Sequence, residues 1–163
     1  MNSIHHRRGR TVNMTTRPFR PAETIPATRV GSLVVADSPF MLKILAQTLR
    51  DAGDFDLVGT ATRAHQALRH VSAVSPELVL MDIEMPDLNS IQGTRYMKQR
   101  EHPPVVILIS SHNNPVTKSL AEQAGADGFV STEVNFRHRL ISVLENLFGS
   151  SQVRRAAASA IHF

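Results

Sequence analysis

The sequence has no cysteine, which excludes disulfides, thiolate metal sites and a cysteine nucleophile. Its hydrophobic runs, such as Val105–Ile109, are far too short to span a bilayer, and the N-terminus lacks the apolar segment of a secretory signal. It has no glycine-rich loop that would cradle a phosphate. The 15 residues after position 148 are too few for a helix-turn-helix unit. Together these absences predict a cytoplasmic protein with no DNA-binding domain.

Charge is unevenly distributed along the 163 residues, of which 42% are hydrophobic. Residues 1–30 carry six Arg and one Glu (+5), residues 31–148 carry ten basic and thirteen acidic side chains (−3), and residues 149–163 carry two Arg (+2), which gives the net +4. The first segment is also rich in proline and has no apolar period. We therefore predict a disordered basic arm over 1–30, a folded domain over 31–148 and a C-terminal tail over 149–163.

The basic arm leaves several interpretations open. Met14 is an alternative start, which would shorten the arm. Its arginines suit contact with nucleic acid or an acidic protein surface, or a solubilising leader. An organelle transit peptide is disfavoured because prolines interrupt any amphipathic helix in this segment.

From Ser32 onward, short apolar strands alternate with amphipathic helices. The expected strands are Ser32–Ala36, Phe55–Ala61, Leu78–Met81, Val105–Ile109 and Gly128–Val130. The expected helices begin at Ser38-Pro39 and end at Gly53, then span Ala64–Val74, Ser90–Arg100, Asn114-Pro115 to Gly125, and Glu133–Phe148. Strands that are apolar on both faces predict an α/β fold with a parallel sheet covered on both sides. Five such units most simply give a doubly wound sheet of order 2-1-3-4-5, a flavodoxin-like topology with its switch point between strands 1 and 3.

Polar side chains follow the strands at the edge where ligands bind in such sheets. Asp37 follows the first strand and Asp82 the third, with Glu84 two residues on. Ser110, Ser111 and His112 follow the fourth strand, and Thr132 follows the fifth. Two converging carboxylates suit Mg²⁺, and one of them can act as a nucleophile towards a phosphoryl group. Each residue alone also has an ordinary structural interpretation, as a helix cap or a turn residue, so the prediction rests on their joint placement.

Four stretches resemble the receiver domains of response regulators, the CheY-like family. They are Leu33–Met41, Leu78–Pro86, Val105–Ser111 and Ala124–Val130, in the family's order and spacing, and the resemblance covers residues 31–148. It implies a (βα)₅ phosphoprotein of two-component phosphorelay signal transduction. Asp82 would be the phosphoacceptor, Ser110 the phosphoryl contact and Phe129 the aromatic switch. Asp37, Asp82 and the backbone carbonyl of Glu84 would bind Mg²⁺.

The sequence departs from the family pattern at three positions. Ala36 stands where the first of two acids is usual, and Thr132 replaces the lysine that supplies a cation to the phosphoryl group. Ser90 stands where glycine is common in the loop after Pro86. The metal site would therefore be weak or absent. Two functions remain open, a single-domain response regulator phosphorylated at Asp82 and a degenerate receiver that binds partners without phosphorylation.

The resemblance also implies partners. A histidine kinase or phosphotransfer protein would donate the phosphoryl group, and a downstream protein would dock on the face formed by the fourth helix, the fifth strand and the fifth helix. That face should carry a basic strip of Lys118, Arg137, His138 and Arg139. A homodimer is a further option. We expect no enzyme activity, because no activated nucleophile–base pair exists beyond the carboxylates.

Overall fold

The computed structural model describes residues 29–87 and 89–149. They form five strands alternating with five helices: β1 (Val30–Val35), α1 (Pro39–Ala52), β2 (Phe55–Ala61), α2 (Ala64–Val74), β3 (Leu78–Asp82), α3 (Ser90–Lys98), β4 (Val105–Ser110), α4 (Pro115–Gln123), β5 (Gly128–Ser131) and α5 (Phe136–Phe148). All neighbouring strands are parallel, and the sheet order is β2-β1-β3-β4-β5. The predicted fold class and strand order are confirmed.

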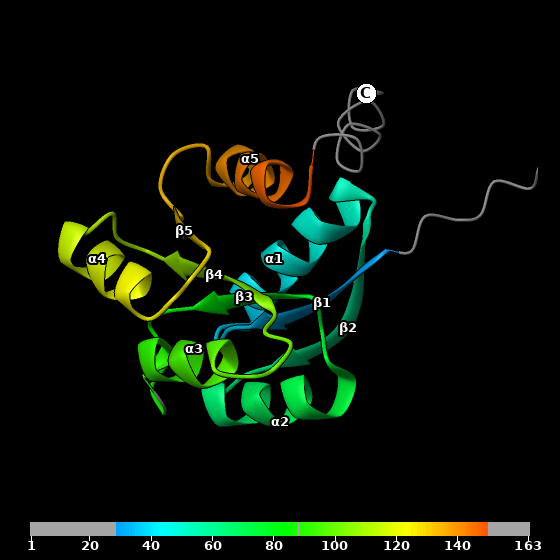
Figure 1. Cartoon of the computed structure of the whole chain (residues 1–163). Coiled ribbons are helices and arrows are strands. Elements are labelled where there is room, and N and C mark those ends of the chain that lie inside the picture. The colour runs from blue at the N-terminus through cyan, green and yellow to red at the C-terminus, as the bar shows by residue number, and fades with distance from the viewer. Residues whose placement is uncertain (1–28, 88, 150–163) are drawn as a thin grey trace, which may run out of the picture.

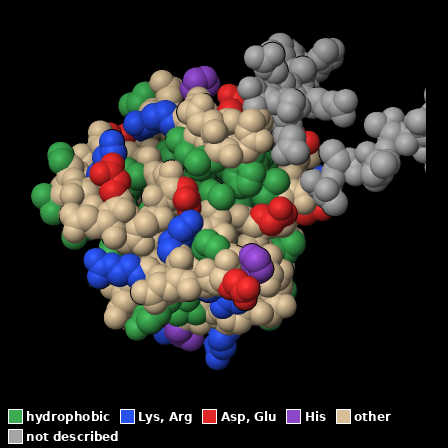
Figure 2. All heavy atoms as spheres, in the orientation of Figure 1, with side chains coloured by type: hydrophobic (Ala, Val, Ile, Leu, Met, Phe, Trp, Pro, Cys, Tyr) green, Lys and Arg blue, Asp and Glu red, His purple; other side chains and the backbone are tan. Residues whose placement is uncertain are grey.

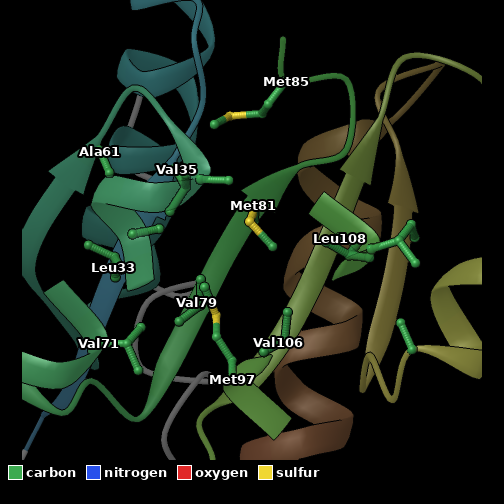
Figure 3. Packing of buried hydrophobic residues seen from close by; sticks show 14 of the residues in the cluster. Leu33, Val35, Ala61, Val71, Val79, Met81, Met85, Met97, Val106 and Leu108 are labelled. Atoms are coloured by element: carbon green, nitrogen blue, oxygen red, sulfur yellow. The ribbon is translucent and has the colours of Figure 1, made fainter. Parts of the chain in front are cut away.

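Two hydrophobic clusters cover the two faces of the sheet. In Figure 1, α1 and α5 lie on one side, and α2 and α3 lie on the other. Leu80 and Ile107 point to the α1–α5 side, where they pack with Leu45 and Leu140, all fully buried. Figure 3 shows the opposite cluster, in which side chains of β1, β3 and β4 meet Val71 of α2 and Met97 of α3. Burial on both sides explains why these strands are apolar at almost every position.

The first strand begins two residues earlier than predicted, at Val30. Val30 pairs with Phe55, and Arg29 forms an exposed ion pair with Asp56 at 3.2 Å. The predicted limit of the arm at residue 30 is therefore slightly wrong. The rest of the predicted arm, and the tail from residue 150, lie outside the described residues.

Helix starts follow the local chemistry. The side chain of Ser38 accepts a hydrogen bond from Met41 N at the start of α1, and Asn114 does the same for Val116 N at the start of α4. Each helix has proline in its first turn, where no amide donor is required. These two predicted starts are confirmed, so the residues that follow β1 and β4 are fixed at the carboxyl edge of the sheet.

The last helix was predicted to start at Glu133, but it starts at Phe136. Asn135 takes a left-handed conformation (φ 62°, ψ 27°) that a helix cannot continue through. The Glu133 amide donates to Ser131 Oγ, and the Glu133 carboxylate accepts Asn113 N–H. These residues therefore form a loop that links the ends of β5 and β4.

The third helix ends at Lys98, two residues before the predicted end. Its C-cap is Gln99 (φ −83°, ψ −4°). The Lys98 ammonium donates to Asp127 at 2.8 Å and to the Pro104 carbonyl at 3.0 Å. These two hydrogen bonds connect the end of α3 to the segments that lead into β4 and β5.

Candidate active site at the carboxyl edge of the sheet

Asp37 and Asp82 follow neighbouring parallel strands at the switch point. Val35 of β1 is paired with Met81 of β3, and β1 lies between β2 and β3. The charge of Asp37 is one of the causes that raise the pKa of Asp82. The two acids therefore follow neighbouring strands at the same edge of the sheet, where the sequence predicts that they converge.

Asp82 is half-buried and is held at two atoms. Its Oδ1 accepts the Glu84 amide at 2.9 Å, and its backbone carbonyl accepts the Ser90 hydroxyl at 2.8 Å. Burial raises the pKa of Asp82, as do the charges of Glu84 and Asp37, while the hydrogen bond from the Glu84 amide opposes the rise. A cation that binds beside Asp82 would relieve this repulsion.

The Glu84 side chain takes part in a polar cluster that the sequence did not predict. Its carboxylate accepts the Ser111 hydroxyl at 2.7 Å and lies 3.0 Å from His112 Nδ1. The hydrogen bond from Ser111 is the main cause that lowers the pKa of Glu84. The signal was present in the sequence, because an acid two residues past β3 and polar residues just past β4 reach the same edge of a parallel sheet.

Ser110 is almost completely buried beside this cluster, with 1% of its surface exposed. Its hydroxyl lies 3.4 Å from Glu84 Oε1 and accepts the His112 amide at 3.1 Å. The predicted phosphoryl contact is therefore at the correct edge, and its hydroxyl is engaged by neighbours other than Asp82.

Thr132 lies next to Ser110, since its amide donates to the Ser110 carbonyl at 2.8 Å. Thr132 is thus placed at the carboxyl edge of the sheet, beside the end of β4. Within residues 29–87 and 89–149, no Lys or Arg forms an ion pair with Asp37, Asp82 or Glu84. In the described part of the chain, the basic side chain at ion-pair distance from these acids is therefore a histidine, His112 beside Glu84, and not a lysine or an arginine.

A bound metal ion would be a further source of positive charge at the site. In the described segments, no group of three or more histidine, aspartate or glutamate side chains is arranged to hold a metal. Asp37 and Asp82 nevertheless offer oxygen donors only, and their mutual repulsion favours a cation between them. This donor set fits Mg²⁺ completed by water and backbone oxygens, and it does not fit a softer metal.

Phe129 and two predicted basic residues surround a pocket next to the site. Phe129 is half-buried against the α2–α3 side of the core and lines a pocket of about 270 Å³ together with Lys118 and Arg139. Arg139 donates from Nη2 to the Ser131 carbonyl at 3.1 Å, and its buried Nε has no hydrogen-bond partner.

The predicted strip of four basic residues is partly wrong. Arg137 forms an ion pair with Asp51 of α1, so it belongs to the α1–α5 contact rather than to the pocket. On the face shown in Figure 2, basic and acidic side chains are interspersed, with no extended area of either sign. The described residues of this face therefore carry no broad basic surface of the kind nucleic-acid binding uses.

The opposite pKa shifts of Asp82 and Glu84 predict opposite effects on stability. Ionised Asp82 destabilises the fold, and this penalty is absent below its ordinary pKa and grows as pH rises through the raised value. Ionised Glu84 stabilises the fold, and this gain is present above its ordinary pKa and is lost as pH falls through the lowered value. At neutral pH without divalent cations, we expect Asp82→Asn to raise the melting temperature and Glu84→Gln to lower it.

Thermal unfolding from neutral pH down to about pH 3 measures both effects. The differences from the parent protein should shrink as the pH falls, because protonation removes the negative charges on which both effects depend. Shifts of the same sign for the two variants at neutral pH would contradict these assignments.

A doubly wound parallel sheet of order β2-β1-β3-β4-β5, with an acid after each of the two strands at its switch point, defines a flavodoxin-like α/β domain with an acidic carboxyl edge. The sequence matches the family model for the response regulator receiver domain over residues 32–145. The chain therefore belongs to the response regulator receiver family. Within the described residues, no helix is long and apolar enough to cross a membrane.

Curated relatives are longer than this chain. It is 32% identical over 126 residues to a protein-glutamate methylesterase/protein-glutamine glutaminase of Halobacterium salinarum, a match that covers 71% of this chain and 36% of that protein. A protein of the same name from Geobacillus kaustophilus is 35% identical over 101 residues, which cover 61% of this chain and 29% of that protein. The chain thus spans about a third of these relatives.

Solved structures show the same fold. The signal receiver domain of the putative response regulator NarL from Mycobacterium tuberculosis superposes with a TM-score of 0.68 at 29% identity, covering 74% of this chain and 98% of that one. The response regulator domain of Thermotoga maritima CheB gives 0.62 at 27% identity, covering 78% and 96%. Both matches cover nearly the whole of the solved receiver domain, so the shared part is the (βα)₅ unit.

Proposed function

We propose that this response regulator receiver domain accepts a phosphoryl group at Asp82 and signals through protein contacts. The observation that carries this proposal is the placement of a half-buried Asp82 at the end of β3, with Asp37 acting on it from the neighbouring strand. A histidine kinase or phosphotransfer protein is the donor that the family implies.

The transfer requires one nucleophile and one leaving group. A carboxylate oxygen of Asp82 attacks the phosphorus of a phosphohistidine, so a P–O bond forms and the P–N bond breaks. The imidazole leaves with the electron pair of that bond and takes up a proton. Asp37, Asp82 and the Glu84 carbonyl would hold Mg²⁺, which would supply positive charge to the phosphoryl oxygens.

The chain's own residues orient the reacting atoms. The Glu84 amide fixes one carboxylate oxygen of Asp82, which leaves the other as the nucleophile. Ser110 is buried beside the site, and its hydroxyl would exchange Glu84 for a phosphoryl oxygen. The pocket that Phe129, Lys118 and Arg139 line would then receive a downstream protein on the α4–β5–α5 face.

A second function is favoured by two specific observations. Ala36 replaces one acid, and Thr132 leaves the described site without a lysine. A degenerate receiver would retain the fold and its docking face, and would bind partners without phosphorylation.

Intact-mass measurement after incubation with a small-molecule phosphodonor and Mg²⁺ separates the two functions. We expect the parent chain to gain one phosphoryl group, and Asp82→Asn to gain none. Asp56→Asn, which alters an exposed acid of β2, should be labelled like the parent. An unlabelled parent, under conditions that label an ordinary receiver domain, would favour the degenerate receiver.

A further inference from the structure

Ser90 is a completely buried serine at a position where the family commonly has glycine. It is the first residue of α3, and none of its surface is exposed. Its hydroxyl donates to the backbone carbonyl of Asp82 at 2.8 Å, across eight residues of sequence. Glycine would lack this donor, so the departure from the family pattern creates a contact with the proposed phosphoacceptor.

The contact is made where the sheet holds Asp82 on one side only. The pairing of β3 with β1 stops at Met81, whereas the pairing with β4 continues through Asp82 and Ile109. The next amide, Ile83 N, also donates to Ile109 O at 2.8 Å. The Ser90 hydroxyl therefore adds a hydrogen bond from the start of α3 to the end of β3. The end of β3 is also held by its pairing with β4.

Ser90 is itself fixed by its neighbours in the first turn of α3. The Asn89 side chain accepts the Ile91 amide at 2.9 Å, and Thr94 Oγ1 donates to the Ser90 carbonyl at 2.8 Å. Thr94 is as fully buried as Ser90. A capped and buried turn is a rigid support from which the hydroxyl can hold the Asp82 main chain.

We propose that Ser90 is a positioning residue for phosphoryl transfer, because its hydroxyl fixes the main chain of Asp82 and thereby aims the carboxylate. This inference rests on the proposed function. Asp82 is then held twice, with Ser90 on its carbonyl and the Glu84 amide on its Oδ1. A displacement of a reacting group by about 1 Å can slow a reaction by about a hundredfold. Loss of the hydrogen bond from Ser90 to the Asp82 carbonyl should therefore change the phosphorylation rate measurably.

The test compares Ser90→Ala with Thr48→Val in the full chain. Both variants remove one buried helix hydroxyl that donates to a backbone carbonyl, but only Ser90 contacts Asp82, because Thr48 of α1 donates to Ile44. Two quantities are measured: the phosphorylation rate at varied phosphodonor concentration with Mg²⁺, and the hydrogen exchange of the Glu84 amide by NMR. A melting curve for each variant shows how far both are destabilised.

We expect Ser90→Ala to lower the rate at saturating donor by about tenfold, with little change in the donor concentration that gives half the maximal rate. Exchange of the Glu84 amide should accelerate severalfold, because its acceptor on Asp82 is no longer held in place. Thr48→Val should leave both quantities near the parent values, even where the two melting temperatures fall equally.

Equal rates and equal Glu84 exchange in the two variants would overturn the role of Ser90. If the parent chain takes up no phosphoryl group, the proposed function fails. In that case the amide exchange alone decides whether Ser90 positions Asp82, since this readout requires neither the donor nor the transfer.

Discussion

Replacing Thr132 with lysine should raise the rate of phosphorylation by a small-molecule donor about thirtyfold, which corresponds to about 2 kcal/mol of transition-state stabilisation. Thr132 is adjacent to Ser110 at the carboxyl edge, and no described Lys or Arg pairs with the acids of the site. A lysine there would supply the charge-assisted contact that a hydroxyl cannot.

Val134→Lys is the matched control for this gain. Val134 lies two residues further along the same loop and is 81% exposed, so the substitution adds the same charge without placing it at the site. The rate constant at saturating donor should rise for Thr132→Lys and stay within about twofold of the parent for Val134→Lys. Equal rates for the two lysine variants would mean that general charge, not position, limits the reaction.

Asp37→Asn should lower the same rate by about a hundredfold, because a metal ion contributes several kcal/mol to the stabilisation of phosphoryl charge. The expected loss is large because Ala36 offers no second acid to replace Asp37. Glu101→Gln removes an equal charge from an exposed residue before β4, at the amino edge of the sheet, and should have little effect. A normal rate in Asp37→Asn would show that Asp82 acts without this partner.

The sheet and its order were predictable because the physical signal is strong in the central strands. β3 and β4 are apolar on both faces, and the structure buries both faces under helices. Helix starts at Ser38-Pro39 and Asn114-Pro115 were predictable for the same local reason, a side-chain cap followed by proline.

Boundaries set by long-range contacts were not predictable. The start of α5 depends on the left-handed Asn135 and on the bond from Asn113 N to Glu133, which joins two loops distant in sequence. The ion pair between Arg137 and Asp51 likewise depends on how α5 packs against α1. Local periodicity contains no information about either contact.

For the site, the sequence predicted which residues reach the carboxyl edge but not how they pair. Parallel strands bring Asp37, Asp82 and Ser110 to one edge by topology alone. The engagement of the Glu84 carboxylate by Ser111 depends on side-chain directions that a strand pattern does not specify. The hydrogen bond from the Ser90 hydroxyl to the Asp82 carbonyl depends on where α3 begins relative to the end of β3.

Calorimetric titration with Mg²⁺ tests the central claim most directly, which is that Asp37 and Asp82 form a single cation site. The account predicts one site in the parent chain, and equal loss of binding in Asp37→Asn, in Asp82→Asn and in the double variant, because either carboxylate alone is insufficient. Binding that survives in both single variants, or that decreases independently in each, would show that the two acids do not share an ion.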